Sequence, residues 1–231
     1  MMEDDEVVEL LVERADSKRI VGNVYKGKVT SVKPGLQAAF VDIGLERAGF
    51  LHASDLDHDD DTDEDNTRGR SRYRKVPDIG TVLKTGDDII VQVTKEPISS
   101  KGPRLTADIS LPGRYLVMMP KGRQIGVSRK IDDRKERNRL KEIVQNNRPE
   151  QGAFIIRTAA TTAQDNVVIA DVKYLGNLFA AIDTKNRESQ APALIHEDVG
   201  MVVGLIRDIF KEDTSRLIID DPVDYKRLME Y

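Results

Sequence analysis

Apolar and polar residues alternate with a period of two over residues 24–31, a pattern typical of a β-strand with one buried and one exposed face. Pro34 and Gly35 interrupt this pattern, which resumes as a second strand over residues 36–43. A third short apolar segment covers residues 49–52. Turn-forming residues separate the three segments, so this part of the chain predicts a meander of three strands.

Two later segments complete a set of five predicted strands. Residues 89–93 are almost continuously apolar, and residues 104–109 follow a turn rich in Ser, Gly and Pro. Five short strands are typical of the OB-fold, a small barrel that binds nucleic acids. A further apolar run at residues 7–12 predicts one strand before the barrel.

The predicted barrel carries planar rings with cationic residues between them. Rings stack on bases and cations bind phosphates, which together favour the binding of single-stranded nucleic acid. The same rings also suit plain core packing, and in that case the barrel suits a protein-interaction module. The rings belong to Tyr25, Phe40, Phe50 and His52, and the cations to Lys26, Lys28, Lys33 and Arg47.

Residues 57–75 form an insertion in which acidic residues are followed by basic ones. The segment has too few apolar side chains to offset its ordering entropy, so we predict that it is largely disordered. Its acidic half suits a solvated loop tip. The alternatives are a weak divalent-cation site and an acidic mimic that competes for basic surfaces. Its basic half either extends an RNA track or neutralises the acidic half.

A predominantly basic segment follows the barrel. A strand bracketed by Pro112 and Pro120 leads into a basic loop, and a helix is predicted between Asp132 and Asn147. Residues 121–148 contain ten Lys or Arg and four Asp or Glu, a local excess of +6. This excess suits either RNA contact or a solvated helix face.

An apolar strand at residues 154–156 ends in Arg157 and Thr158. The planar fork of an arginine donates two hydrogen bonds to phosphate oxygens, and a threonine hydroxyl adds a third. This pair favours a terminal monophosphate over an internal phosphodiester.

Helices and strands are predicted to alternate in the last third of the chain, which is typical of an α/β arrangement. Apolar residues three and four positions apart predict a helix at about residues 166–186 with one buried stripe. Asp220 and Asp221 resemble a metal-binding pair, but the following Pro222 favours a helix cap. The other predicted elements are a strand at residues 193–196, a helix at 199–210, a strand at 216–219 and a final helix after Asp221.

Composition narrows the classes of function. The 231 residues, 39% hydrophobic and 33% charged, suit one medium or two small domains. A formal net charge of −4 excludes a protein that coats nucleic acid non-specifically, so RNA contact must come from local patches. The lack of cysteine excludes disulfides, thiolate zinc sites and a cysteine nucleophile. No apolar run is long enough for a membrane span and the acidic start is unlike a signal peptide, so we expect a cytoplasmic protein.

Several segments resemble the ribonuclease E/G family: YKGKV, AAFVDIG and GFL in the barrel, and GRYLVMMP, GVSRKI and IIRTAA after it. The resemblance implies an OB-fold RNA-binding domain of the ribosomal S-one type, followed by a sensor for a 5′-monophosphate. The resulting RNA-binding candidates are Tyr25, Lys26, Lys28, Phe40, Phe50, His52, Lys95 and Lys101, and the phosphate-binding candidates are Gly113, Val117, Arg157 and Thr158. Ordinary solubilising lysines at 95 and 101, and simple strand packing at Gly113 and Val117, are the alternatives.

By this resemblance the fold is α+β, with the five-stranded barrel and an α/β sensor region inserted in an incomplete RNase H-like α/β subdomain. The implied boundaries are residues 1–21 for a residual RNase H-like strand, 22–110 for the OB-fold domain, 111–190 for the 5′-sensor region and 191–231 for the RNase H-like part. The family has a longer start, so we expect the beginning of this chain to be trimmed.

The magnesium-dependent nuclease centre of the family uses two aspartates and an asparagine in a following domain, and we find no counterpart here. We therefore expect no catalytic residue, metal site or cofactor in this chain, which would be inactive alone as the RNA-binding portion of an endoribonuclease for RNA processing and decay. The alternative is a stand-alone, non-catalytic protein that binds single-stranded RNA. The expected partner is single-stranded RNA with a 5′-monophosphate and not a membrane, and the resemblance leaves a homo-oligomer of the complete enzyme open.

Overall fold

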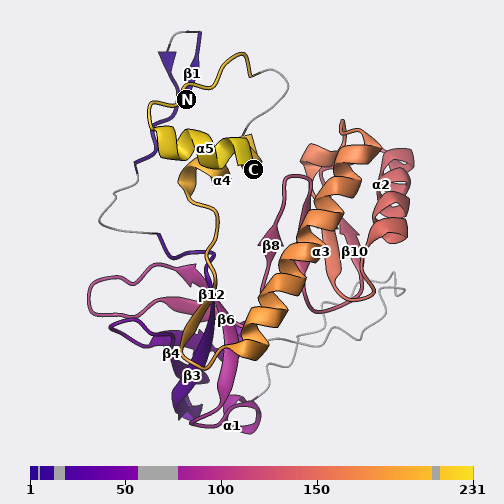
Figure 1. The fold of residues 1–231 in the computed structure, drawn as a ribbon. Coiled ribbons are helices and arrows are strands. Elements are labelled where there is room, and N and C mark those ends of the chain that lie inside the picture. Colours follow the sequence, from indigo (N-terminus) through magenta and orange to yellow (C-terminus); the bar gives the residue numbers. More distant parts are fainter. Residues whose placement is uncertain (5, 13–18, 57–77, 210–213, 231) are drawn as a thin grey trace. The chain divides into compact units, whose positions relative to one another are not determined.

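The computed structural model describes residues 1–4, 6–12, 19–56, 78–209 and 214–230 (Figure 1). The chain divides into two units, which we describe separately. The larger unit comprises residues 21–197, and the smaller unit comprises residues 1–20 and 198–231. The insertion predicted at residues 57–75 lies outside the described residues.

The first part of the larger unit is a closed barrel of five strands, as the sequence pattern predicts. The strands pair in the order β3-β4-β5-β7-β6, and β6 pairs back onto β3. The strands are β3 (Val24–Lys33), β4 (Ala38–Asp42), β5 (Gly49–His52), β6 (Asp88–Lys95) and β7 (Arg104–Thr106). A short helix, α1 (Ile79–Val82), precedes β6.

The long strand β3 closes the barrel because its two halves have different partners. Residues 24–28 pair with β6, and residues 28–33 pair with β4. At Gly27 a Cβ atom would lie 2.4 Å from Cγ1 of Val41, so this close approach of two strands requires glycine. A further strand, β12 (Ala193–His196), pairs antiparallel with the beginning of β3. Alternating apolar side chains are buried, namely Val29, Val41, Leu51, Val91, Val93 and Leu105.

A four-stranded sheet covered by two helices forms the second part of the larger unit. The strands β8 (Leu111–Pro112), β9 (Leu116–Met119), β10 (Ile125–Val127) and β11 (Ala153–Ile156) lie in the order β10-β11-β9-β8. The helices α2 (Arg134–Asn147) and α3 (Asp165–Glu188) pack against this sheet and against each other. Buried side chains from both layers, including Met118, Leu140, Phe154, Val172 and Leu175, form one hydrophobic core. The helix predicted at about residues 166–186 is therefore confirmed as α3.

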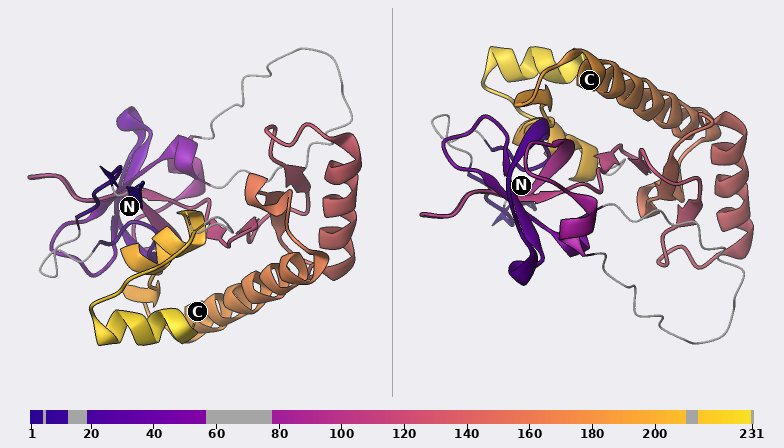
Figure 2. Two further views of the ribbon diagram at one scale, coloured as in Figure 1. Left: turned by 90° about the horizontal axis from the view of Figure 1, so that it is seen from above. Right: turned by 90° about the horizontal axis from the view of Figure 1, so that it is seen from below.

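Helix α3 extends from the four-stranded sheet to the barrel (Figures 1 and 2). At its C-terminal end, Nζ of Lys26 on β3 donates hydrogen bonds to the carbonyl oxygens of Asn186 and Ser189, at 3.0 and 2.9 Å. A cation at this end of a helix satisfies exposed carbonyls and interacts favourably with the helix dipole. These contacts connect the barrel directly to α3.

In the smaller unit, the structure differs from the prediction at two segments that were expected to be strands. It contains the hairpin of β1 (Met2–Glu3) and β2 (Glu6–Val7) and the helices α4 (Met201–Ile209) and α5 (Pro222–Glu230). The strand predicted at residues 7–12 is wrong beyond Val7, and the strand predicted at residues 216–219 is absent from the described residues. Both apolar segments are largely exposed and have no described strand to pair with, and an unpaired segment does not satisfy its backbone groups.

The final helix begins with the predicted cap. Oδ1 of Asp221 accepts hydrogen bonds from the backbone N–H groups of Val223 and Asp224, at 2.6 and 3.0 Å. These are the groups that the first turn of a helix leaves without an intrahelical partner. The contacts match the capping role predicted for Asp221.

Candidate nucleic-acid interface

Three aromatic rings lie side by side on the outside of the barrel. Phe40 of β4 and Phe50 of β5 are directly opposite each other in register, and their ring centroids are 5.9 Å apart in an edge-to-face arrangement. The ring of His52 lies 6.4 Å from that of Phe50. All three side chains are partly exposed, whereas their neighbours Val41 and Leu51 are buried. Ring faces are therefore available on this side of β4 and β5.

Two cations continue the line of Phe40 and Phe50 across the barrel. Phe50 is in register with Arg104 of β7, and Arg104 is in register with Lys95 of β6. Arg104 is partly exposed next to the buried Leu105, and Lys95 is exposed beyond a register shift that separates it from the buried Val93, so both cations lie on the outer face. We call Phe40, Phe50, Arg104 and Lys95 the binding row. It combines two rings with two cations over four neighbouring strands.

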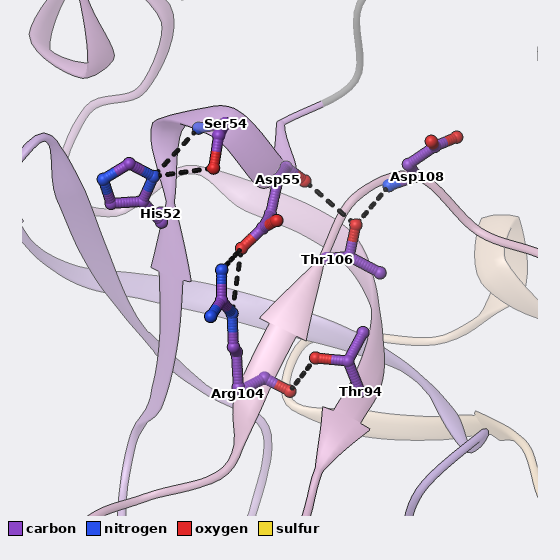
Figure 3. A network of polar contacts seen from close by, with 7 residues as sticks. All are labelled: His52, Ser54, Asp55, Thr94, Arg104, Thr106 and Asp108. Atoms are coloured by element: carbon purple, nitrogen blue, oxygen red, sulfur yellow. Dashed lines mark hydrogen bonds and ion pairs between the residues drawn. The ribbon is translucent and has the colours of Figure 1, made fainter.

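The guanidinium of Arg104 is held by Asp55, which follows β5 (Figure 3). Its Nε and Nη2 donate to Oδ2 of Asp55 at 3.1 and 2.8 Å. The hydroxyl of Thr106 and the backbone N–H of Ala107 both donate to the Asp55 carbonyl oxygen, at 3.1 and 2.8 Å. Asp55 is thus fixed to β7, and it fixes Arg104 beside the rings.

The imidazole of His52 has a defined hydrogen-bonding pattern (Figure 3). Its Nδ1 accepts a hydrogen bond from the backbone N–H of Ser54 at 3.1 Å and lies 2.8 Å from the Ser54 hydroxyl. Because Nδ1 acts as an acceptor, the neutral ring carries its proton on Nε2. His52 therefore presents an N–H donor at the end of the ring cluster.

Three of the predicted RNA-binding residues on β3 have structural contacts instead. Tyr25 is only 6% exposed, and its hydroxyl lies 3.5 Å from Nδ2 of Asn23, so its ring is not on the surface. Lys26 contacts the end of α3. Lys28 forms a surface ion pair with Asp88 at 2.7 Å, and this hydrogen bond lowers the pKa of Asp88. These residues do not join the binding row, whereas the exposed Lys95 does and the exposed Lys101 lies in the turn between β6 and β7.

The candidate phosphate site joins the end of β11 to the turn between β8 and β9. Nη1 of Arg157 donates to the carbonyl oxygen of Gly113 at 2.8 Å, and the backbone N–H of Arg157 donates to Tyr115 O at 2.8 Å. Thr158 follows with an exposed side chain, and Val117 of β9 is partly buried opposite Ile155. Of the four predicted residues, the structure brings Arg157 and Gly113 into direct contact.

Sequence reasoning missed Asp171, a carboxylate on α3 beside this site. Asp171 is 9% exposed, and its oxygens accept hydrogen bonds from the N–H groups of Arg114, Tyr115 and Leu116 at 3.2, 2.8 and 2.9 Å. Burial raises the pKa of Asp171, while these bonds and the charge of Arg157 oppose the rise. Its position within the buried stripe of α3, next to Val172, was the signal that an acid there needs a partner.

Several cations of the basic segment hold the fold together. Nη1 of Arg137 donates to the carbonyl oxygens of Ser128 and Ile131, at 2.9 and 3.0 Å. Arg139 donates to both carboxylate oxygens of Glu136, at 2.9 and 2.6 Å, and lowers the pKa of that carboxyl group. Part of the predicted excess of positive charge is therefore committed to contacts within the protein.

The described residues contain no group of three or more His, Asp or Glu side chains arranged to hold a metal ion. Among the same residues, no helix is both long and apolar enough to cross a membrane.

The closed barrel with its ring-and-cation face defines an RNA-binding module. Residues 18–106 match the S1 RNA binding domain, which agrees with this assignment. Residues 110–231 match the Ribonuclease E/G family, and the chain belongs to that family.

Curated relatives agree with this assignment. The chain is 39% identical over 224 residues to Ribonuclease G of Escherichia coli K12, a match that covers 96% of this chain and 45% of the relative. It is 36% identical over 230 residues to Ribonuclease E of Nostoc, covering 99% of this chain and 31% of the relative. The chain thus spans less than half the length of these relatives. A solved structure, GSP13 from Bacillus subtilis, is 30% identical over 39% of this chain and 56% of its own, with a TM-score of 0.28.

Proposed function

We propose that the chain binds single-stranded RNA along the barrel and recognises a 5′-monophosphate at Arg157 and Thr158. In this proposal it is the RNA-binding portion of a cytoplasmic endoribonuclease of the E/G type that acts in RNA processing and decay. The observation that carries the proposal is the binding row, because two rings and two cations are aligned across neighbouring strands.

Stacking and charge explain how the binding row would hold RNA. Every base has a π-face, so a partly exposed ring binds bases of any sequence, with about 1–3 kcal/mol per stacked base. Arg104 and Lys95 supply charge for the phosphates between the bases, and Asp55 keeps Arg104 close to Phe50. Because the net charge of the chain is −4, this local charge is what favours RNA.

Arg157 and Thr158 suit the end of a strand better than its middle. A terminal monophosphate has a second pKa of about 6, so it carries close to two negative charges and offers three oxygens. An internal phosphodiester carries one charge and two free oxygens. The guanidinium donates in a planar fork and the exposed Thr158 hydroxyl adds a donor, which together favour the terminal group.

The barrel assignment is tested by comparing the loss of one ring on the row with the loss of one elsewhere. The affinity for a single-stranded RNA with a 5′-hydroxyl is measured for the wild type, Phe50→Ala and Tyr174→Ala, since Tyr174 is a 43% exposed ring on α3. Phe50→Ala should weaken binding by about 1–3 kcal/mol, and Tyr174→Ala should leave it unchanged. Equal affinities for the wild type and Phe50→Ala would exclude the row as the RNA surface.

Cleavage is assigned in this proposal to residues of the complete protein other than those described here. The proposed magnesium-dependent reaction requires a metal site, and the described residues contain no group of three or more His, Asp or Glu side chains arranged to hold a metal ion. The alternative function, a stand-alone RNA-binding protein, would use the same RNA contacts but would not cleave RNA. Incubating the 231-residue chain with RNA and magnesium should leave the RNA intact. Cleavage by this chain would contradict the assignment.

A further inference from the structure

We propose that Asp171 is a positioning residue of the phosphate site: it fixes the turn after β8, and that turn orients the guanidinium of Arg157. The inference rests on the proposed recognition of a 5′-monophosphate. Asp171 would act through the turn and Arg157, because its own oxygens accept hydrogen bonds from backbone N–H groups.

The carboxylate of Asp171 is buried against the turn after β8. The carboxylate is 9% exposed, and three successive backbone N–H groups, from Arg114 to Leu116, donate to it at 2.8 to 3.2 Å. A buried carboxylate is costly unless such donors surround it. In return, the turn is held in one conformation, because all three donors converge on one side chain of α3.

Gly113 fits tightly against the carboxylate of Asp171. A Cβ atom at this position would lie 2.5 Å from Oδ1 and 2.6 Å from Oδ2 of Asp171. Those distances are far below van der Waals contact, and they involve a side chain held by three hydrogen bonds. Any larger residue at position 113 would therefore displace either the turn or the carboxylate. The role of Gly113 is to let the turn close on Asp171.

The turn is connected to Arg157 by two hydrogen bonds. Nη1 of Arg157 donates to the carbonyl oxygen of Gly113, and the Arg157 backbone N–H donates to the carbonyl oxygen of Tyr115, both at 2.8 Å. Both ends of Arg157 are thus bound to the segment that Asp171 holds. The negative charge of Asp171 also interacts favourably with the guanidinium. Without Asp171, neither the position nor the orientation of the Arg157 side chain would be fixed.

The same contacts limit how a phosphate is bound. Successive backbone N–H groups in a turn form a concave site for anions. Here Asp171 occupies those groups, so a phosphate is directed to the side chains of Arg157 and Thr158 instead. Recognition then depends on a guanidinium whose orientation is fixed before RNA arrives.

The test compares two RNAs that differ only in a 5′-monophosphate or a 5′-hydroxyl, at one fixed salt concentration. The variants are Asp171→Ala, Asp171→Asn and Leu175→Ala, a control that creates a cavity under α3 at a residue that is 0% exposed. Asp171→Ala should remove most of a wild-type preference of about tenfold for the monophosphate, as expected for loss of an oriented charge-assisted hydrogen bond. Its affinity for the hydroxyl-ended RNA should stay that of the wild type.

The other variants separate positioning from general stability. In Asp171→Asn one oxygen can still accept from Tyr115 and Leu116, so part of the preference should remain. Leu175→Ala should lower the unfolding temperature but keep the preference. A loss of preference in Leu175→Ala equal to that in Asp171→Ala, at the same unfolding temperature, would reduce Asp171 to a stabilising residue and overturn the inference.

A measurement without RNA tests the positioning directly. NMR of the arginine side chains should show a protected Nη–H signal for Arg157 in the wild type, from its bond to Gly113, and loss of this protection in Asp171→Ala. An unchanged Arg157 signal in Asp171→Ala would overturn the inference. If the wild type shows no preference between the RNAs and the Arg157 signal still depends on Asp171, the proposed function fails while the positioning role stands.

Discussion

Phe40 on β4 and Phe50 on β5 are paired in register, and the edge of one ring meets the face of the other at a centroid distance of 5.9 Å. Edge-to-face pairs of this kind contribute about 0.5–1.5 kcal/mol beyond the area that they bury. The pair therefore supports two partly exposed rings on the barrel surface. It makes each ring a stable platform for a base.

This pairing predicts that the two rings act together in RNA binding. Phe40→Ala and Phe50→Ala should each weaken binding of single-stranded RNA by about 1–3 kcal/mol. The double variant should lose less than the sum of the two, because each single variant already removes the edge-to-face support of the other ring. A double-mutant cycle on binding free energies checks this. Strict additivity would show that the rings bind independently.

Arg104 should contribute mainly through charge. Arg104→Ala should weaken binding and reduce the slope of log affinity against log salt by about 0.7, the value for one phosphate contact on a single strand. Lys84 is also exposed but precedes β6, at the opposite end of that strand from Lys95, and Lys84→Ala should leave the slope unchanged. Salt titrations of the three proteins provide the test. An unchanged slope in Arg104→Ala would remove Arg104 from the binding row.

The ion pair with Asp55 should lower the affinity of Arg104 for RNA phosphates, so removing the charge of Asp55 should raise the RNA affinity of the protein. In Asp55→Asn the guanidinium loses a charged partner that holds it at 2.8 Å. We therefore expect binding at low salt to become stronger, since the net charge of the binding surface becomes more positive. Weaker binding in Asp55→Asn would mean instead that the orientation of Arg104 matters more than its charge.

Lys26 should affect stability and not RNA binding. Lys26→Met keeps the aliphatic stem but removes two hydrogen bonds to the end of α3, so it should lower the free energy of unfolding by about 1 kcal/mol. Lys28→Met, which removes only a surface ion pair, is the matched control and should cost less. Urea unfolding gives both values. A large loss of RNA affinity in Lys26→Met, without loss of stability, would contradict the structural role.

The raised pKa of Asp171 predicts a specific dependence of stability on pH. Burial raises this pKa above 3.8, so the folded protein holds the proton more tightly than the unfolded chain does. The contribution of Asp171 to stability should therefore fall as the pH rises from 3.8 through the raised folded-state pKa. Asp171→Asn lacks this titration, so its difference in unfolding free energy from the wild type reports the effect. A wild-type advantage that grows with pH would show that the hydrogen bonds and Arg157 outweigh burial.

The barrel was predictable because its signal is local. A period of two, with turn residues between the segments, defines strands whichever partner each finally has. The alternation also places Tyr25 with Gly27 and Val29, all of which are buried, so the pattern itself argued against an exposed Tyr25. For Phe40 and Phe50 the same pattern left core and surface open, and only the closed barrel placed them outside.

The remaining contacts depend on residues far apart in the chain. Arg104 and Asp55 are separated by 49 positions, and Asp171 and Tyr115 by 56, so neither pair gives a periodic signal. The strands predicted at residues 7–12 and 216–219 failed for the converse reason, because apolar sequence favours a strand but only a partner strand completes one. Asp171 is the most informative residue that the sequence prediction omitted. An acidic residue within an apolar stripe indicates a buried polar contact, but the sequence does not show which residue is its partner.

The most direct test of the proposed account is the difference in affinity between 5′-monophosphate and 5′-hydroxyl forms of one single-stranded RNA, at fixed salt, for the wild type and variants of Arg157. The wild type should bind the monophosphate about tenfold more tightly. Arg157→Ala should abolish this difference and leave the affinity of the hydroxyl-ended RNA nearly unchanged, because the barrel retains its binding row. Arg157→Lys should restore little, since a lysine provides a charge without the planar fork. Equal affinity of the wild-type chain for the two RNA ends would contradict the account and leave the barrel as its only supported RNA site.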